Sequence, residues 1–192
     1  MGRVPYLVPP ALPSGTVSGR LQPVLTGSAV RVRPWTAQDA PELVTAYADP
    51  DIQRWHCRSL DLVEAVALIE EWNEAWVDEI SASWAVTDGE RVLGRVGFRV
   101  VDLSAGVAEV GYWVLPSARG RGVARDALAT LTRWSFDDLG LQRLELTHST
   151  ENQASCRVAA AVDYPLEGTA RASVLHTDGW HDMHRHARVR TD

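Results

Sequence analysis

The sequence predicts one mixed α/β domain, built on a mostly antiparallel sheet of about seven strands flanked by about four helices. Apolar residues recur at helical spacing in the early part of the chain and again after residue 122, but they alternate with polar residues between 82 and 115. Turns that carry proline or glycine separate these segments. A length of 192 residues suits a single domain with its own hydrophobic core.

The first 27 residues are predicted to be an extension without helices. Prolines and glycines interrupt it at Pro5, Pro9, Pro10, Pro13, Gly15, Gly19, Pro23 and Gly27. The extension would either pack on the domain or a partner, or project into solvent. We therefore expect the folded domain to span residues 28–192.

The first half of that domain reads as a strand followed by two helices. An alternating strand at residues 30–34 precedes a short helix, which Asp49-Pro50 is expected to end. A longer helix begins near Ser59 or Asp61. Its apolar face is predicted to consist of Leu62, Val66, Ile69, Trp76 and Ile80.

The second half begins with an antiparallel meander of three strands, whose first turn is Asp88-Gly89. A helix from Gly122 to Gly140 and a strand at 144–148 follow, and this order predicts a right-handed crossover to a parallel neighbour. A helix at 153–162 and a hairpin around Asp178-Gly179 complete the chain.

Composition excludes several classes of function. The net charge is -6, which disfavours nucleic-acid binding through a generally basic surface. Every basic residue other than histidine is arginine, so Schiff-base chemistry on lysine and a P-loop lysine are both excluded. No apolar run approaches the roughly 20 residues of a membrane span. Two cysteines, Cys57 and Cys156, and the absence of a secretory signal fit a reducing cytoplasm.

The most informative segment is the turn between residues 114 and 124, where a strand passes through two glycines into a helix. The first turn of a helix offers unpaired N–H groups and the positive end of the dipole, so an anion site, most simply for a pyrophosphate, is expected here. A tight turn that binds nothing is the alternative. A dinucleotide-binding fold is disfavoured, because Arg125 occupies its third glycine position and antiparallel strands precede the turn.

Arg119, Gly122 and Ala124 match the acyl-CoA loop pattern of the GNAT superfamily of N-acetyltransferases, which the order of elements also resembles. The strand 108–114 and the segment 152–159 resemble the RimJ/RimL-like subgroup. The resemblance implies that acetyl-CoA, or another acyl-CoA, is the co-substrate and that no metal is needed. The implied cofactor-binding residues are Trp113, Val114, Leu115, Arg119, Gly120, Arg121, Gly122, Val123, Ala124, Arg125 and Asn152.

The same resemblance implies direct attack of a primary amine on the thioester. Many relatives carry a tyrosine seven residues after the asparagine as the acid that protonates the thiolate, but Ala159 stands there. Ser155 matches the serine of the subgroup and is the candidate donor, with helix capping as its alternative role. Glu109 is the candidate base, with an ion pair to Arg95 or Arg99 as its alternative.

One position departs from the family pattern. Asp163 stands before Tyr164, where relatives have a glycine that favours a left-handed helix end. An altered turn would move Tyr164 and Glu167 at the acceptor edge. Together with the missing tyrosine, this departure leaves open a second function, a CoA-binding sensor or partner module without turnover.

Other features carry weaker expectations. Trp35 and Trp55 would line an acceptor pocket for a small amine or a protein N-terminus, although they would equally suit a homodimer interface. An acidic run, Glu70, Glu71, Glu74 and Asp78, would either attract a cationic acceptor or form a solvated helix face. His181, Asp182, His184 and His186 share a strand that could hold a metal, but the prediction is no metal and an inert buried Cys156. Neither nucleic acid nor membrane is expected as a partner.

Overall fold

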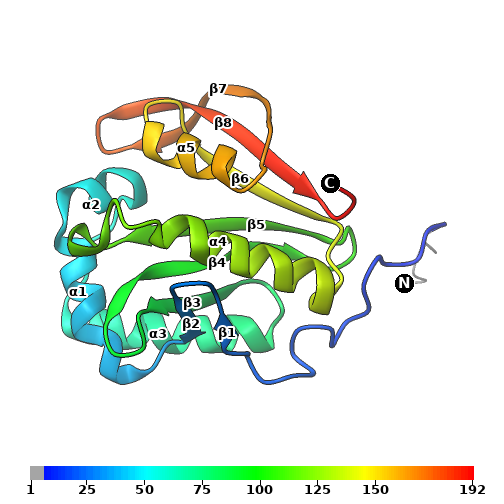
Figure 1. Ribbon diagram of the computed structural model, residues 1–192, viewed down its shortest axis with the longest axis horizontal. Coiled ribbons are helices and arrows are strands. Elements are labelled where there is room, and N and C mark those ends of the chain that lie inside the picture. Colours follow the sequence, from blue (N-terminus) through cyan, green and yellow to red (C-terminus); the bar gives the residue numbers. More distant parts are fainter. Residues whose placement is uncertain (1–6) are drawn as a thin grey trace, which may run out of the picture.

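The computed structural model describes residues 7–192, so residues 1–6 of the extension lie outside the described part. It confirms the mixed α/β fold and shows an eight-stranded sheet in the order β1-β2-β3-β4-β5-β6-β8-β7 (Figure 1). The strands are β1 (Leu25–Thr26), β2 (Arg31–Pro34), β3 (Ala82–Thr87), β4 (Val92–Asp102), β5 (Val107–Val114), β6 (Arg143–Ser149), β7 (Leu166–His176) and β8 (Gly179–Val189).

Five α-helices cover this sheet: α1 (Ala40–Ala48), α2 (Pro50–His56), α3 (Leu62–Val77), α4 (Val123–Trp134) and α5 (Gln153–Ala161). Within residues 7–192, β5 and β6 form the parallel pair and the other neighbours are antiparallel. Helix α4 makes the predicted crossover between them. A π-helical turn, Ser135–Leu139, continues α4 until Gly140 ends it with a left-handed backbone.

The hydrophobic core forms on both faces of the sheet. Trp84, Phe98 and Trp134 pack together in one cluster with the apolar face of α4. A second cluster joins α1, α2 and α3 to Trp35 and Trp113. All six residues of β3 are buried, because alternate side chains enter opposite clusters.

The predicted end of the first helix at Asp49-Pro50 is also the start of another helix. Asp49 caps α2 by accepting the Ile52 N–H at 3.1 Å, and Pro50 occupies the first helical position, where no N–H is needed. The sequence reading missed α2 because it treated this proline only as a breaker. The short second helix places Trp55 and His56 in the wall of a large cleft, which is described below.

The predicted apolar face of α3 is wrong at its ends. Leu62 and Ile80 are 56% and 58% exposed, whereas Leu68 and Trp72 are buried. Helix α3 begins at Leu62 and ends at Val77, so Ile80 lies outside the helix. At the N-terminal end of α3, the buried face lies one position away from the predicted apolar face. The residues of the acidic run are exposed on the outer surface.

The N-terminal extension packs on the domain from residue 11 onward, whereas Leu7 and Val8 are exposed. Val17 is 1% exposed, and β1 adds a short strand to the edge of the sheet beside β2. The indole N–H groups of Trp76 and Trp84 donate to the carbonyl oxygens of Arg20 and Pro23. No helix within residues 7–192 combines the length and apolarity needed to cross a bilayer.

One carboxylate fastens this segment. Glu79 accepts the backbone N–H groups of Gly15, Val17 and Ser18 at 2.7 to 3.0 Å, and also a bond from the Ser14 hydroxyl. Desolvation pushes the pKa of Glu79 upward, but these hydrogen bonds outweigh it and lower the pKa to about 2.

Replacement of Glu79 should therefore loosen the extension. Glu79→Ala leaves three N–H groups without their acceptor, and we expect a loss of about 1 kcal/mol of stability with faster proteolysis near residue 15. The folded-state pKa is depressed, so the wild-type contribution is present above pH 4.5 and is lost as the pH falls toward 2. Urea unfolding of the wild type and the variant, above pH 4.5 and again near pH 2, measures this contribution to stability. The exposed Glu74→Ala is the control, and an equal loss in both variants would contradict the assignment.

Candidate active site

The central feature of the site is the divergence of β5 and β6. Residues Val107–Val110 of β5 pair with Arg143–Leu146 of β6, but the rest of β5 pairs only with β4. Two hollows open at this point. A groove of about 600 Å³, here called the α4–α5 groove, runs between the end of β5, the start of α4, and α5. A cleft of about 850 Å³, here called the central cleft, lies beside β5, β6 and the β7–β8 hairpin.

The groove and the cleft meet at shared residues. Both are lined by Trp55, His56, Tyr112, Asn152 and Ser155. A ligand in the groove and another in the cleft would therefore approach each other from opposite sides at these side chains.

The groove presents backbone donors at two places. The Leu115 N–H donates to Leu93 of β4 at 2.8 Å, and peptide groups alternate along a strand, so the Val114 N–H points to the open side of β5. At the start of α4, the N–H groups of Val123, Ala124 and Arg125 precede the first intrahelical bond, from Asp126 to Gly122. These donors and the helix dipole favour an anion.

Glycines shape the turn into α4. Gly120 and Gly122 have φ of +73° and +77°, a left-handed backbone that residues with a Cβ adopt at a cost. A Cβ at either position would meet open space, so their requirement is conformational rather than steric. The turn leaves the backbone accessible to a ligand.

The arginines of the turn differ in their environments. The Arg119 guanidinium is held by Asp49 at 2.6 Å and by Asp51 at 2.7 Å, which compensates its charge. Arg121 and Arg125 are exposed beside the helix start. The positive field of the groove therefore comes from the helix terminus and these two side chains more than from Arg119.

Most of the predicted cofactor residues line the α4–α5 groove, and Leu115 and Arg121 do not. Leu115 is 8% exposed and packs in the core with Trp113. Trp35, predicted at the acceptor pocket, is 3% exposed, donates its indole N–H to Ser83, and lines neither hollow. The Trp35 side chain packs in the core beside Trp72, whereas Trp55 lines both the groove and the central cleft.

Ser155 lies near the N-terminus of α5, and the capping role belongs to its neighbour. Asn152 caps the helix, its side-chain oxygen accepting the Ser155 N–H at 3.0 Å. The Ser155 hydroxyl thus remains available to the groove. Ala159, at the position of the missing tyrosine, is completely buried.

Tyr112 brings a phenol to the same place from β5. Its hydroxyl is buried without a hydrogen-bond partner among the described residues. Burial raises the pKa of Tyr112 to about 12, an effect that the neighbouring Ser155 hydroxyl opposes. Tyr112 therefore stays protonated at neutral pH. The sequence reading missed it because nothing in the strand pattern distinguishes this tyrosine from a core residue.

His56 is the other residue that the sequence did not reveal. Burial, with the nearby charges of Arg95 and Arg99, lowers its pKa to about 3, so the imidazole is neutral at pH 7. Its position depends on the undetected helix α2. No short-range motif marks it.

Glu109 lies in the central cleft, 30% exposed, with one oxygen 3.5 Å from Arg99. A β-bulge at Arg99 changes the register between β4 and β5, and the arginine then crosses Gly111 to reach the carboxylate. Arg95 instead stacks on Trp72 and donates to Ser83. The predicted alternative role of Glu109, an ion pair with an arginine of the neighbouring strand, is therefore present, and its partner is Arg99 rather than Arg95.

Asp163 keeps the left-handed helix end that glycine would give. Its φ is +59°, and the Tyr164 N–H donates to Ala159 at 3.0 Å across the turn. Tyr164 is buried and bonded to Thr132 rather than placed at the acceptor edge. Glu167 does line the cleft, where it pairs with Arg143.

The chain is similar in sequence and in fold to known acetyltransferases. The acetyltransferase (GNAT) domain family matches residues 29–164. The N-acetyltransferase YoaA of Bacillus subtilis, itself uncharacterised, is 24% identical over 78% of this chain and 86% of its own. The ribosomal-protein-serine acetyltransferase of Escherichia coli is 26% identical over 52% of this chain and 56% of its own. The structure of Mycobacterium smegmatis RimJ, in complex with a CoA disulfide, superposes with a TM-score of 0.79 at 23% identity, covering 87% of this chain and 86% of that one.

The chain belongs to the GNAT acetyltransferase family. Its sequence similarity to the ribosomal-protein-serine enzyme supports the RimJ/RimL-like resemblance, and the superposition on RimJ shows that the fold is shared.

The left-handed turn before α4 should respond to substitution through backbone strain alone. We expect Gly122→Ala to destabilise the protein by about 1 kcal/mol, because a Cβ is disfavoured at a φ of +77° although it meets no atoms. Gly122→Asn is the matched control, since asparagine tolerates this conformation better. Urea unfolding compares them, and an asparagine variant as unstable as the alanine variant would contradict the explanation.

Proposed function

We propose that this protein transfers an acetyl, or another short acyl group, from acyl-CoA to a primary amine by direct attack in a ternary complex. The observation that carries the proposal is the meeting of two hollows at Ser155 and Tyr112, one with an anion-binding helix start and one with a carboxylate. Each hollow would hold one substrate, and the reacting atoms would meet between them.

The α4–α5 groove suits the CoA donor. The N–H groups of Val123 to Arg125 would hold the pyrophosphate, and Asn152 would contact the pantetheine arm through its amide NH₂, since its oxygen caps α5. The open side of β5 would pair with the arm as an added strand. GNAT family membership and the CoA in the RimJ structure support this assignment.

The reaction requires one new bond and one broken bond. The amine nitrogen attacks the thioester carbonyl, the C–N bond forms, and the C–S bond breaks to release the thiolate. The Val114 N–H would stabilise the oxyanion of the tetrahedral intermediate. Ser155 would donate the proton that the thiolate takes and would regain one from the intermediate's nitrogen, which must lose a proton to become an amide. The protonated Tyr112 beside it would be a further hydrogen-bond donor. This sequence of steps uses no metal.

The central cleft suits the acceptor. Glu109 would take the proton that the acceptor's ammonium must lose before its nitrogen can attack, directly or through water, while Arg99 orients the carboxylate. A protein N-terminus is the favoured acceptor, because its ordinary pKa near 7.7–8.0 leaves part of it neutral at pH 7. The ribosomal-protein-serine relative is likewise named for action on a protein, which favours a protein acceptor over a small amine. A cytoplasmic location and a homodimer remain predictions.

Amine-dependent release of free CoA tests the function. Incubation with acetyl-CoA and a panel of N-terminal peptides and small amines should produce thiol only when an amine is present. Mass spectrometry should show the acetyl group on the acceptor nitrogen. Tight CoA binding without thiol release across the panel would contradict the proposal and favour a sensor that binds CoA without turnover.

Ser155→Ala should lower kcat by roughly 100-fold with a smaller effect on the KM for acetyl-CoA, because the hydroxyl acts on the leaving thiolate. Ser59→Ala, an exposed position outside both hollows, should behave as wild type. Steady-state kinetics with the best acceptor of the panel separate the two parameters. An unchanged kcat would remove Ser155 from the mechanism while leaving CoA binding intact.

A further inference from the structure

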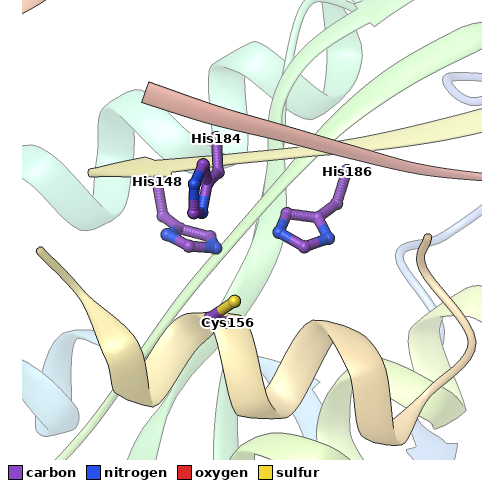
Figure 2. A group of neighbouring side chains, drawn as sticks. All are labelled: His148, Cys156, His184 and His186. Carbon is purple, nitrogen blue, oxygen red and sulfur yellow. The ribbon is translucent and has the colours of Figure 1, made fainter. Parts of the chain in front are cut away.

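Three histidines and a cysteine converge between α5 and the strands β6 and β8, and two of them, His148 and His186, also line the wall of the central cleft, although the proposed transfer uses none of the four. They are His148 of β6, His184 and His186 of β8, and Cys156 of α5 (Figure 2). One potential ligand atom from each lies within 4.8 Å of every other. We infer that these four side chains form a structural zinc site.

The β-sheet register places the histidines together. His148 and His184 are direct partners across β6 and β8, and His186 lies two residues further along β8 on the same face. Their ring centroids are 5.1 to 6.0 Å apart. Figure 2 shows Cys156 pointing from α5 toward the rings, so the helix closes the fourth side.

Hydrogen bonds at the far side of two rings orient them for metal binding. Nδ1 of His148 is 2.8 Å from the Ser149 carbonyl oxygen, and Nδ1 of His186 is 2.9 Å from the Tyr164 carbonyl oxygen. A carbonyl oxygen only accepts, so each Nδ1 carries the proton and each Nε2 presents a lone pair to the cluster. Backbone carbonyls commonly hold metal-binding histidines in this way.

The ring nitrogens that face the cluster make no hydrogen bond to any of the described residues. Nε2 of His148, Nε2 of His186 and Nδ1 of His184 are all buried without a hydrogen-bond partner. Buried polar atoms without partners are costly, and three in one place are unusual. A cation bound between them would satisfy all three lone pairs.

The chemistry of the donor set selects the metal. Three imidazole nitrogens and one thiolate match the tetrahedral coordination of Zn²⁺, at about 2.0–2.1 Å to nitrogen and 2.3 Å to sulfur. The four ligand atoms lie up to 4.8 Å from one another, so metal binding requires them to move closer together, and the half-buried Cys156 and His184 are the side chains with the most room to move. Because protein atoms fill all four positions, the site is structural and leaves no position for substrate.

The tertiary structure selects a different set from the one that the sequence suggested. His181 bonds to Ser149 and Asp178, and Asp182 accepts the Ala172 N–H, so neither points into the cluster. A second group, Glu151, Asp178 and His181, already contains Arg54, which pairs with both carboxylates. It therefore carries no metal proposal.

Zinc here would hold α5 against the sheet. Cys156 directly follows Ser155, and the same helix begins at the Asn152 cap. The ion would thus fix the helix turn that carries the proposed proton donor. Metal binding does not depend on the proposed transfer reaction, so the two proposals fail separately.

The test is cobalt and zinc binding by the untagged full-length protein after chelator treatment and dialysis. One equivalent of Co²⁺ should give visible ligand-field bands typical of tetrahedral coordination, together with a near-ultraviolet band from thiolate to cobalt. Zn²⁺ should displace the cobalt, abolish these bands and raise Tm. A wild-type protein that binds neither ion, or binds Co²⁺ without the thiolate band, would overturn the proposal.

Variants assign the ligands. Cys156→Ser should remove the thiolate band, and His184→Gln should weaken Zn²⁺ binding at least 10-fold in competition with a chelating dye. Cys57→Ser is the matched control, because this other free cysteine is exposed and lies outside the cluster. Circular dichroism establishes that each variant is folded. Retention of the band in folded Cys156→Ser, or its loss in Cys57→Ser, would contradict the assignment.

Discussion

The divergence of β5 from β6 after Val110 is the constraint on which the site depends. Hydrogen bonding joins the two strands over only part of their length. Beyond that point, the peptide groups of β5 that point away from β4 face open space. The Val114 N–H and the start of α4 then line one continuous groove. Helix α5 forms the other wall and carries Ser155. A fully paired β5 and β6 would bury these groups and leave no room for a thioester between the strands.

Ion pairs neutralise two of the charged side chains around that opening. Asp49 and Asp51 engage Arg119, and Arg99 engages Glu109. The groove therefore attracts anions chiefly through backbone donors and the dipole of α4, which are fixed in place without side-chain ordering. Such preorganised donors are the kind that stabilise developing charge most effectively.

The proposed zinc site and the proposed acyl-transfer site share one structural element. Helix α5 presents Asn152 and Ser155 to the groove, and Cys156 to the histidines of β6 and β8. Its position relative to β5 decides how far Ser155 lies from Tyr112. An ion between the helix and strands β6 and β8 would reduce the freedom of this turn, and would thus link the stability of these strands to the geometry of the proposed acyl-transfer site.

The sequence by itself determined the order of strands and helices apart from β1 and α2, together with the crossover through α4 and the glycine turn before it, because these features follow from local periodicity and turn chemistry. It also pointed to Ser155 and Asn152 through family resemblance. Only the tertiary structure decided that Trp35 belongs to the core, that Tyr112 and His56 reach the site, and that Cys156 meets three histidines. These side chains come from elements far apart in the chain, and strand register and helix packing, which no short-range pattern encodes, bring them together.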